Sequence, residues 1–300
     1  MKLSTRLTTV GFWLGWNLLW LFPKSFVAWA FNQASDYCWR KRIKGVRQLE
    51  ANLSRVLDSS PQDEKIRDLS RQAMRAYMRY YYETFLIARW SKGKINARVR
   101  AENVEPVIEA LKSGGVILTL PHSGNWDLAG AWAALNLGKV ASVAERLEPE
   151  MIFKKFLLIR SKLGMNIFPL TGEAGVYEFL RSQIRAGSLV PLLGDRDVAK
   201  NGMGNTFFGH RASLPIGAAV LALDTQRPLF TCSTWYDGDQ LVITFDEQVP
   251  MPTEIANGRE RLRQAQQISA ELATRFESHI KAHSADWHML QAVWSDLVVD

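Results

Sequence analysis

Apolar runs of strand length alternate with helix-like stretches between residues 105 and 193. The apolar runs lie at 116–121, 139–147, 165–170 and 188–193. The stretches around them have helical spacing or end at glycine, and they lie at 105–115, 127–138, 148–163 and 174–186. Continuous apolar strands separated by helices are typical of a sheet covered on both faces. The sequence therefore predicts an α/β fold, with a mixed central sheet flanked by helices.

Further elements are predicted on either side of this region. Residues 228–249 have the pattern of a hairpin with its turn at 237–239, and a long helix is expected over about 257–283. An apolar and aromatic tail follows at 286–294. Before residue 100, apolar spacing predicts a helix over 46–57, and a Ser-Pro-acidic start indicates a second one over about 62–90.

The first 31 residues are apolar in two blocks, 10–22 and 26–31, separated by Pro23 and Lys24. The first block has 13 positions, fewer than the roughly 20 that a helix needs to span a bilayer. Basic residues ahead of it resemble a secretory signal, but bulky tryptophans and the Pro-Lys pair argue against cleavage there. We expect a helix in the membrane interface, with packing on the body of the protein as the alternative for part of the segment.

Charge and tryptophan are concentrated at the same end of the chain. Residues 1–100 hold 19 Lys and Arg against 7 Asp and Glu, whereas residues 101–300 hold 18 against 23. Trp13, Trp16, Trp20, Trp29 and Trp39 all fall within the first 40 residues. A basic segment rich in tryptophan indicates docking to an anionic membrane rather than to nucleic acid. We therefore divide the chain into a membrane-association segment, 1–45, and an α/β domain, 46–300.

Polar residues follow three of the predicted strands. His122 comes after the first, Glu145 lies in the turn that ends the second, and Asp195 with Arg196 comes after the fourth. Sites of α/β sheets lie at the carboxyl ends of their strands, so these groups are expected to converge on one crevice.

His122 is the candidate general base, because a histidine with a pKa near ~6.5 accepts a proton at physiological pH. Asp127, five residues later, is expected to hold the ring through its other nitrogen. A G-x-S-x-G nucleophile motif is not found in the sequence. A histidine-carboxylate pair without its own nucleophile suits acyl transfer from a thioester to an alcohol that the substrate supplies.

Several segments together resemble a known family. They are LPHSGNWDLAG (120–130), SVAERLEPE (142–150), FPLTG (168–172), GDRD (194–197), TFFGHRASLPIGAAVLAL (206–223) and ADWHMLQAVW (285–294). The chain is similar through them to the bacterial lipid acyltransferases that include the lipid A lauroyl and myristoyl transferases. The resemblance covers nearly the whole chain and is greatest to the actinobacterial branch that acylates phosphatidylinositol mannosides.

The resemblance implies a glycerolipid-acyltransferase-like fold and a peripheral enzyme on the cytoplasmic face of the inner membrane. Such an enzyme moves a long acyl chain, typically palmitoyl, from acyl-CoA to the 6-hydroxyl of the mannose on position 2 of inositol. Acyl-CoA is a co-substrate, and no cofactor, metal or nucleic acid is implied.

The resemblance also assigns roles to residues. His122 matches the general base, Asp127 its orienting carboxylate, and Glu145 a glutamate in the active-site groove. Asp195 takes the place of a glutamate in the relatives, which is one methylene longer, and Arg196 resembles an anion-binding arginine. Ion pairs within the protein, such as one between Arg196 and Glu145, remain the alternative for these groups.

Other residues are candidates for binding. Arg160 and Arg211 are expected either to bind phosphates of CoA or of the inositol lipid or to lie in solvent. His288 is either structural or in contact with the acceptor headgroup. His279 and His283 have the spacing of two metal ligands on a helix, but a surface pair is the preferred interpretation.

Three rival functions stay open. The acceptor could be a lipid A precursor or glycerol phosphate, the protein could be a non-catalytic lipid-binding protein, or it could be a metal-dependent hydrolase. The presence of both His122 and Asp127 argues against a decayed site.

Overall fold

The computed structural model describes residues 3–172 and 174–299. Its centre is a seven-stranded sheet with the order β1-β9-β8-β2-β5-β3-β4. The strands are β1 (Val99–Glu102), β2 (Val116–Leu120), β3 (Val140–Ala144), β4 (Met165–Pro169), β5 (Leu189–Leu193), β8 (Leu229–Asp237) and β9 (Gln240–Phe245). The hairpin β8–β9 is antiparallel and the other pairs are parallel, so the prediction of a mixed α/β sheet is confirmed.

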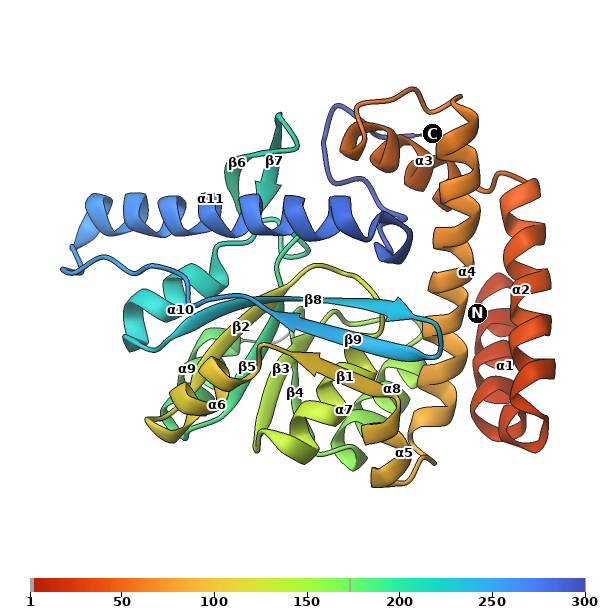
Figure 1. Cartoon of the computed structure of the whole chain (residues 1–300), viewed down its shortest axis with the longest axis horizontal. Coiled ribbons are helices and arrows are strands. Elements are labelled where there is room, and N and C mark those ends of the chain that lie inside the picture. Colours follow the sequence, from red (N-terminus) through yellow and green to blue (C-terminus); the bar gives the residue numbers. More distant parts are fainter. Residues whose placement is uncertain (1–2, 173, 300) are drawn as a thin grey trace.

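Helices cover both faces of the sheet, as shown in Figure 1. One apolar cluster joins the sheet to α5 (Lys92–Ala97), α6 (Glu105–Lys112) and α7 (Trp126–Asn136). The other joins it to α9 (Val176–Arg185), α10 (Gly217–Thr225) and α11 (Gly258–Ala282), which lies along the sheet. Strand β2 is buried at every position, with Ile117 in one cluster and Leu118 in the other, because successive side chains point to opposite faces.

Three of the helices before the sheet pack against a fourth. Helix α4 (Glu64–Ile87) contacts α1 (Leu3–Leu18), α2 (Lys24–Arg40) and α3 (Lys44–Val56). Trp16 of α1 is buried, and its ring centre lies 5.3 Å from that of Phe85 on α4 and 5.2 Å from that of Phe156 on α8 (Glu150–Lys162). One face of the N-terminal segment therefore packs on the body, as the alternative interpretation expected.

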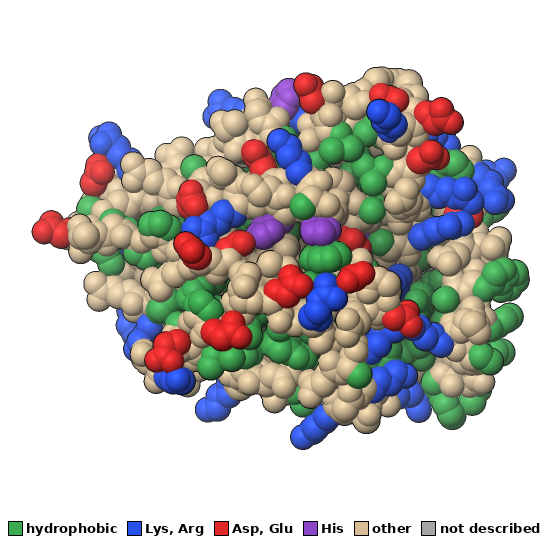
Figure 2. Space-filling view, in the orientation of Figure 1, with side chains coloured by type: hydrophobic (Ala, Val, Ile, Leu, Met, Phe, Trp, Pro, Cys, Tyr) green, Lys and Arg blue, Asp and Glu red, His purple; other side chains and the backbone are tan. Residues whose placement is uncertain are grey.

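The other face of this segment is exposed and apolar. Its side chains gather over α1, the short helix η1 (Leu19–Leu21) and α2, at the right-hand edge of Figure 2. They are Val10, Trp13, Leu14, Leu18, Trp20, Leu21, Phe22, Phe26 and Trp29, which we call the aromatic face. Within the described residues, no helix is both long enough and apolar enough to cross a bilayer.

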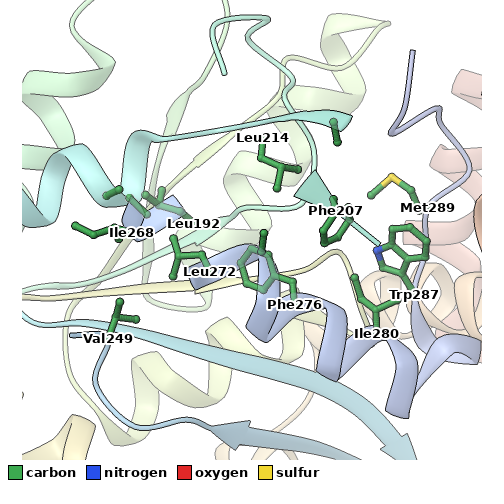
Figure 3. Packing of buried hydrophobic residues seen from close by; sticks show 14 of the residues in the cluster. Leu192, Phe207, Leu214, Val249, Ile268, Leu272, Phe276, Ile280, Trp287 and Met289 are labelled. Carbon is green, nitrogen blue, oxygen red and sulfur yellow. The ribbon is translucent and has the colours of Figure 1, made fainter. Parts of the chain in front are cut away.

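Two elements lie beside the sheet. The hairpin of β6 (Met203–Phe207) and β7 (His210–Leu214) packs on α11. The tail runs from the short helix η2 (Ser284–Asp286) back toward α3 and buries Trp287 and Trp294 completely. Figure 3 shows Trp287 in the apolar cluster beside α11, among Phe207, Ile280 and Met289.

Candidate active site

Strand register places His122 opposite Asp195. Strands β2 and β5 are parallel neighbours, with Leu120 paired to Leu193. His122 and Asp195 each come two residues after these partners, so they leave the sheet at the same edge and level. Strand β3 lies on the far side of β5 and ends just before Glu145. The predicted convergence of the three strand ends is therefore confirmed.

His122 and Asp195 form a close pair. The Nδ1 atom of His122 lies 2.5 Å from Oδ1 of Asp195, and the backbone N–H of His122 donates to Oδ2 over 2.9 Å. The Asp195 side chain is fully buried, whereas that of His122 is 17% exposed and lines a cavity. A neutral imidazole that donates from Nδ1 keeps its lone pair on Nε2, the atom that a general base uses.

Asp195 also accepts a hydrogen bond from the indole Nε1 of Trp287, over 2.8 Å. Burial alone would raise the pKa of the Asp195 carboxyl, but the His122 ring and these donors hold that pKa below its ordinary value. Asp195 is therefore ionised at neutral pH and able to stabilise a protonated His122.

Asp127 does not take the position expected for it, and this is a correction. Its carboxylate accepts from Nε and Nη2 of Arg160, over 2.6 and 3.2 Å, and from the Tyr80 hydroxyl over 3.0 Å. Among the described residues, the carboxylate on the His122 ring is that of Asp195. The physical reason is orientation, because Asp127 sits in the first turn of α7, on the side that meets α4 and α8.

Asp127 and His122 still share a neighbour, Trp126. The Trp126 ring lies edge-on to His122 with centres 5.6 Å apart, and it also packs against the rings of Tyr80 at 4.2 Å and His288 at 6.0 Å. The bonds of Asp127 to Tyr80 and Arg160 hold the start of α7 and therefore the ring beside the base.

The turn between His122 and α7 is tightly held. Gly124 has φ +56°, and a Cβ there would lie 2.7 Å from the carbonyl oxygen of Thr234, so glycine is required. The Asn125 side chain caps α7 by accepting from Leu128 N–H over 3.0 Å. Its amide donates to the buried Glu83, a residue that the sequence reasoning missed within a run of tyrosines.

Glu145 and Arg196 form an ion pair with each other at the cavity wall. The Glu145 side chain is 44% exposed and that of Arg196 is 19% exposed. This is the alternative that the sequence left open, and it places Glu145 beside the site rather than on the His122 ring.

Of the three remaining binding candidates, two line the cavity and one does not. Arg160 lines the cavity, but its guanidinium is engaged by Asp127. Arg211 is exposed on β7 and is not brought to the cavity. His288 lines the cavity and is buried, which lowers its pKa to about 4, and its Nε2 lies 2.8 Å from the Gly124 carbonyl oxygen.

His279 on α11 and His283, which follows its last residue, have partners within the protein. His279 pairs with Asp246 over 2.7 Å, and the His283 ring stacks on Trp235 with centres 4.0 Å apart. Across residues 3–172 and 174–299, no group of three potential ligands is placed to hold a metal ion.

The cavity has a volume of about 600 Å³ and is largely apolar. His122 stands at its polar end, and Leu118, Leu120, Ala133, Met165 and Leu189 line its apolar part. Glycine at position 130 of α7 leaves room for the Met165 side chain, because a Cβ there would lie 2.5 Å from the Met165 sulfur. A space of this size and lining suits an apolar chain with one reactive polar end.

A family model and two curated relatives all relate this chain to acyltransferases. The model of the family described as bacterial lipid A biosynthesis acyltransferase matches residues 2–296. A protein of Mycolicibacterium smegmatis named phosphatidylinositol mannoside acyltransferase is 33% identical over 296 residues, 98% of this chain and 93% of that protein. A protein of the same name from Mycobacterium tuberculosis H37Rv is 35% identical over 290 residues, 93% of this chain and 86% of that protein.

Proposed function

The chain belongs to the bacterial lipid A biosynthesis acyltransferase family, and from this premise we propose that it acylates phosphatidylinositol mannosides. The donor in this proposal is a long-chain acyl-CoA, and the acceptor is the 6-hydroxyl of a mannose. The acceptor rests on the names of the relatives. The chemistry rests on one observation, the His122–Asp195 pair at the polar end of an apolar cavity.

In the proposed reaction, Nε2 of His122 removes the proton of the acceptor hydroxyl while the oxygen attacks the thioester carbonyl. The tetrahedral intermediate then expels the CoA thiolate, and the imidazolium returns its proton to the sulfur. Asp195 stabilises the imidazolium between these steps. The acyl group passes directly between substrates, without a covalent enzyme intermediate.

The other residues act around this pair. Asp127 and Arg160 position α7 and Trp126, while Glu145 and Arg196 border the place where the acceptor would lie. His288 adds a neutral nitrogen, Nδ1, that has no hydrogen-bond partner among the residues the structure describes. We assign it to the acceptor headgroup, because a buried acceptor atom lining the cavity is suited to a sugar hydroxyl.

We further propose that residues 1–45 attach the enzyme to the cytoplasmic face of the inner membrane and that residues 46–300 perform catalysis. The aromatic face supports this, since exposed tryptophan beside basic residues is typical of interfacial helices.

Transfer of radiolabelled palmitoyl from palmitoyl-CoA tests the proposal. Acceptors would be phosphatidylinositol mono- and dimannosides, a lipid A precursor and glycerol 3-phosphate, each with wild type, His122→Ala and the control His210→Ala. His210 is exposed on β7, so its loss should leave the rate unchanged. We expect transfer to the mannosides, lost in His122→Ala. Transfer to another acceptor alone would overturn the substrate, and full activity of His122→Ala would overturn the base.

A further inference from the structure

We propose that Trp287, in the C-terminal tail, is a positioning residue that holds the Asp195 carboxylate ionised and in line with His122. The inference deepens the proposed function, since it concerns the same histidine-carboxylate pair. Trp287 acts on the base through Asp195 and does not need to touch a substrate.

The Asp195 carboxylate has three hydrogen-bond donors, and Trp287 supplies the one that does not come from His122. Oδ1 faces the His122 ring, while Oδ2 accepts from the His122 backbone N–H and from the Trp287 indole over 2.8 Å. An indole N–H is a donor only and stays protonated at any pH at which the protein is folded. It therefore favours the charged carboxylate whatever the charge of His122.

The tail is also bound to the loop that carries the base. Trp287 forms an isolated antiparallel β-bridge with Ser123. The backbone N–H of His288 donates to the carbonyl oxygen of His122 over 2.8 Å, and the backbone N–H of Gly124 donates to the carbonyl oxygen of Asp286 over 2.9 Å. These bonds fix the distance between the indole and the residues that follow β2.

The Trp287 ring has little freedom to turn away from Asp195. It is fully buried, and Figure 3 shows it among Phe207, Ile280 and Met289 in the apolar cluster beside α11. Side chains in such close packing keep one rotamer. The indole N–H is thus presented to Asp195 before any substrate binds.

Replacing the indole by phenyl should make the carboxylate more basic. With one donor fewer, Asp195 holds the proton of the imidazolium more tightly, and the pair gives up that proton at a higher pH. The other titratable groups that line the cavity stay unchanged in this variant. They are Tyr77, Tyr80, Tyr81, Asp127, Glu145, Arg160, Tyr177, Arg196, Asp197, Cys232 and His288.

The test compares Trp287→Phe with Trp294→Phe. Trp294 is a matched control, because it is equally buried in the same tail and its indole donates over 3.2 Å to the Phe207 carbonyl oxygen. An NMR titration of the His122 ring, assigned with His122→Ala, reads the pair without any substrate. Relative to wild type, we expect the His122 pKa to rise by about 0.5 unit or more in Trp287→Phe and to be unchanged in Trp294→Phe.

Kinetics provide the second readout. In Trp287→Phe, the acid limb of kcat/KM should move to higher pH, and kcat should fall while KM for palmitoyl-CoA stays within about twofold. In an Asp195→Asn background, adding Trp287→Phe should change the rate by less than about twofold. An unmoved His122 pKa, or the same loss of rate in both backgrounds, would mean a merely structural tryptophan and overturn the proposal.

The role of Trp287 can still be decided if the variant does not fold or if the proposed function fails. If Trp287→Phe does not fold, the indole N–H resonance of Trp287 is compared between wild type and Asp195→Asn, and an unchanged resonance contradicts the bond. If no acceptor is acylated by wild type, the proposed function fails, while the NMR titration still decides the role of Trp287.

Discussion

At the scale of single residues, the ion pair of Asp127 and Arg160 is nearly closed to solvent, with side chains 3% and 14% exposed. We expect Arg160→Met to lower the free energy of unfolding by about 3–5 kcal/mol, because it leaves a buried carboxylate with Tyr80 as its neutral partner. The double variant Asp127→Asn/Arg160→Met should recover part of that loss. Urea unfolding measures both.

The control for this prediction is Arg181→Met. Arg181 and Glu178 form an exposed pair on α9, so breaking it should change stability by less than about 0.5 kcal/mol. Equal losses in Arg160→Met and Arg181→Met would contradict the importance of enclosure.

Asp286 gives a prediction of pH dependence. Its burial raises the pKa to about 6, although a Tyr236 backbone hydrogen bond and Arg79 oppose the shift. The native state then binds this proton more tightly than the unfolded chain, so Asp286 destabilises the fold progressively between about pH 4 and pH 6 and by a constant amount above.

Asp286→Asn should therefore raise the free energy of unfolding at pH 8 by roughly 3 kcal/mol, with little gain at pH 4. Denaturant unfolding at several pH values measures the difference. Asp296→Asn serves as the control, since Arg55 lowers the pKa of Asp296 and its replacement should bring no gain at pH 8. A gain for Asp286→Asn that is independent of pH would exclude titration as the cause.

At the scale of elements, the turn from β2 to α7 determines where His122 points. Gly124→Ala must strain φ and also push a methyl group against the Thr234 carbonyl oxygen. We expect it to lower the transfer rate about 100-fold or more, because a displaced base loses its geometry. Palmitoyl transfer and circular dichroism would be measured together.

Gly138→Ala is the control that separates backbone strain from steric collision. Gly138 has φ +110° but open space around its Cβ position, so the variant has the backbone strain without the collision. It should lose about 1 kcal/mol of stability and keep its activity. Similar activity in the two alanine variants would show that the turn tolerates movement.

The order of strands and helices from 105 to 193 and the meeting of His122, Glu145 and Asp195 were predictable, since both follow from local periodicity and the direction of parallel strands. Strand β1, the hairpin β6–β7 and α10 were not predicted. Strand β1 pairs with β9, more than 130 residues later, and no local signal encodes such pairing.

The carboxylate partner of His122 could not be read from spacing. Asp127 is near in sequence, but the packing of α7 on α4 and α8 turns it toward Tyr80 and Arg160. Asp195 is 73 residues away, and the register of β2 with β5 brings it to the ring. Helix orientation and strand register are tertiary properties, so the sequence alone favoured the wrong neighbour for the ring.

At the scale of the whole molecule, the aromatic face should govern membrane attachment. Replacing Trp13, Trp20, Phe26 and Trp29 by serine should abolish binding to vesicles that contain anionic lipid, as measured by flotation. The control Ile108→Ser/Leu262→Ser removes exposed apolar residues from α6 and α11 and should bind like wild type. Equal binding of both variants would place the attachment elsewhere.

The packing of Trp16 between Phe85 and Phe156 joins the aromatic face to α8, and Arg160 of α8 holds the first turn of α7 through Asp127. An enzyme that rests on a bilayer through α1 and α2 would thus keep His122 at one height above the lipid surface. The height of His122 then helps to select the acceptor lipid, because His122 can reach a hydroxyl only if the lipid headgroup projects that far from the membrane. Such an enzyme selects its acceptor by the length of the lipid headgroup as well as by the chemistry of that headgroup.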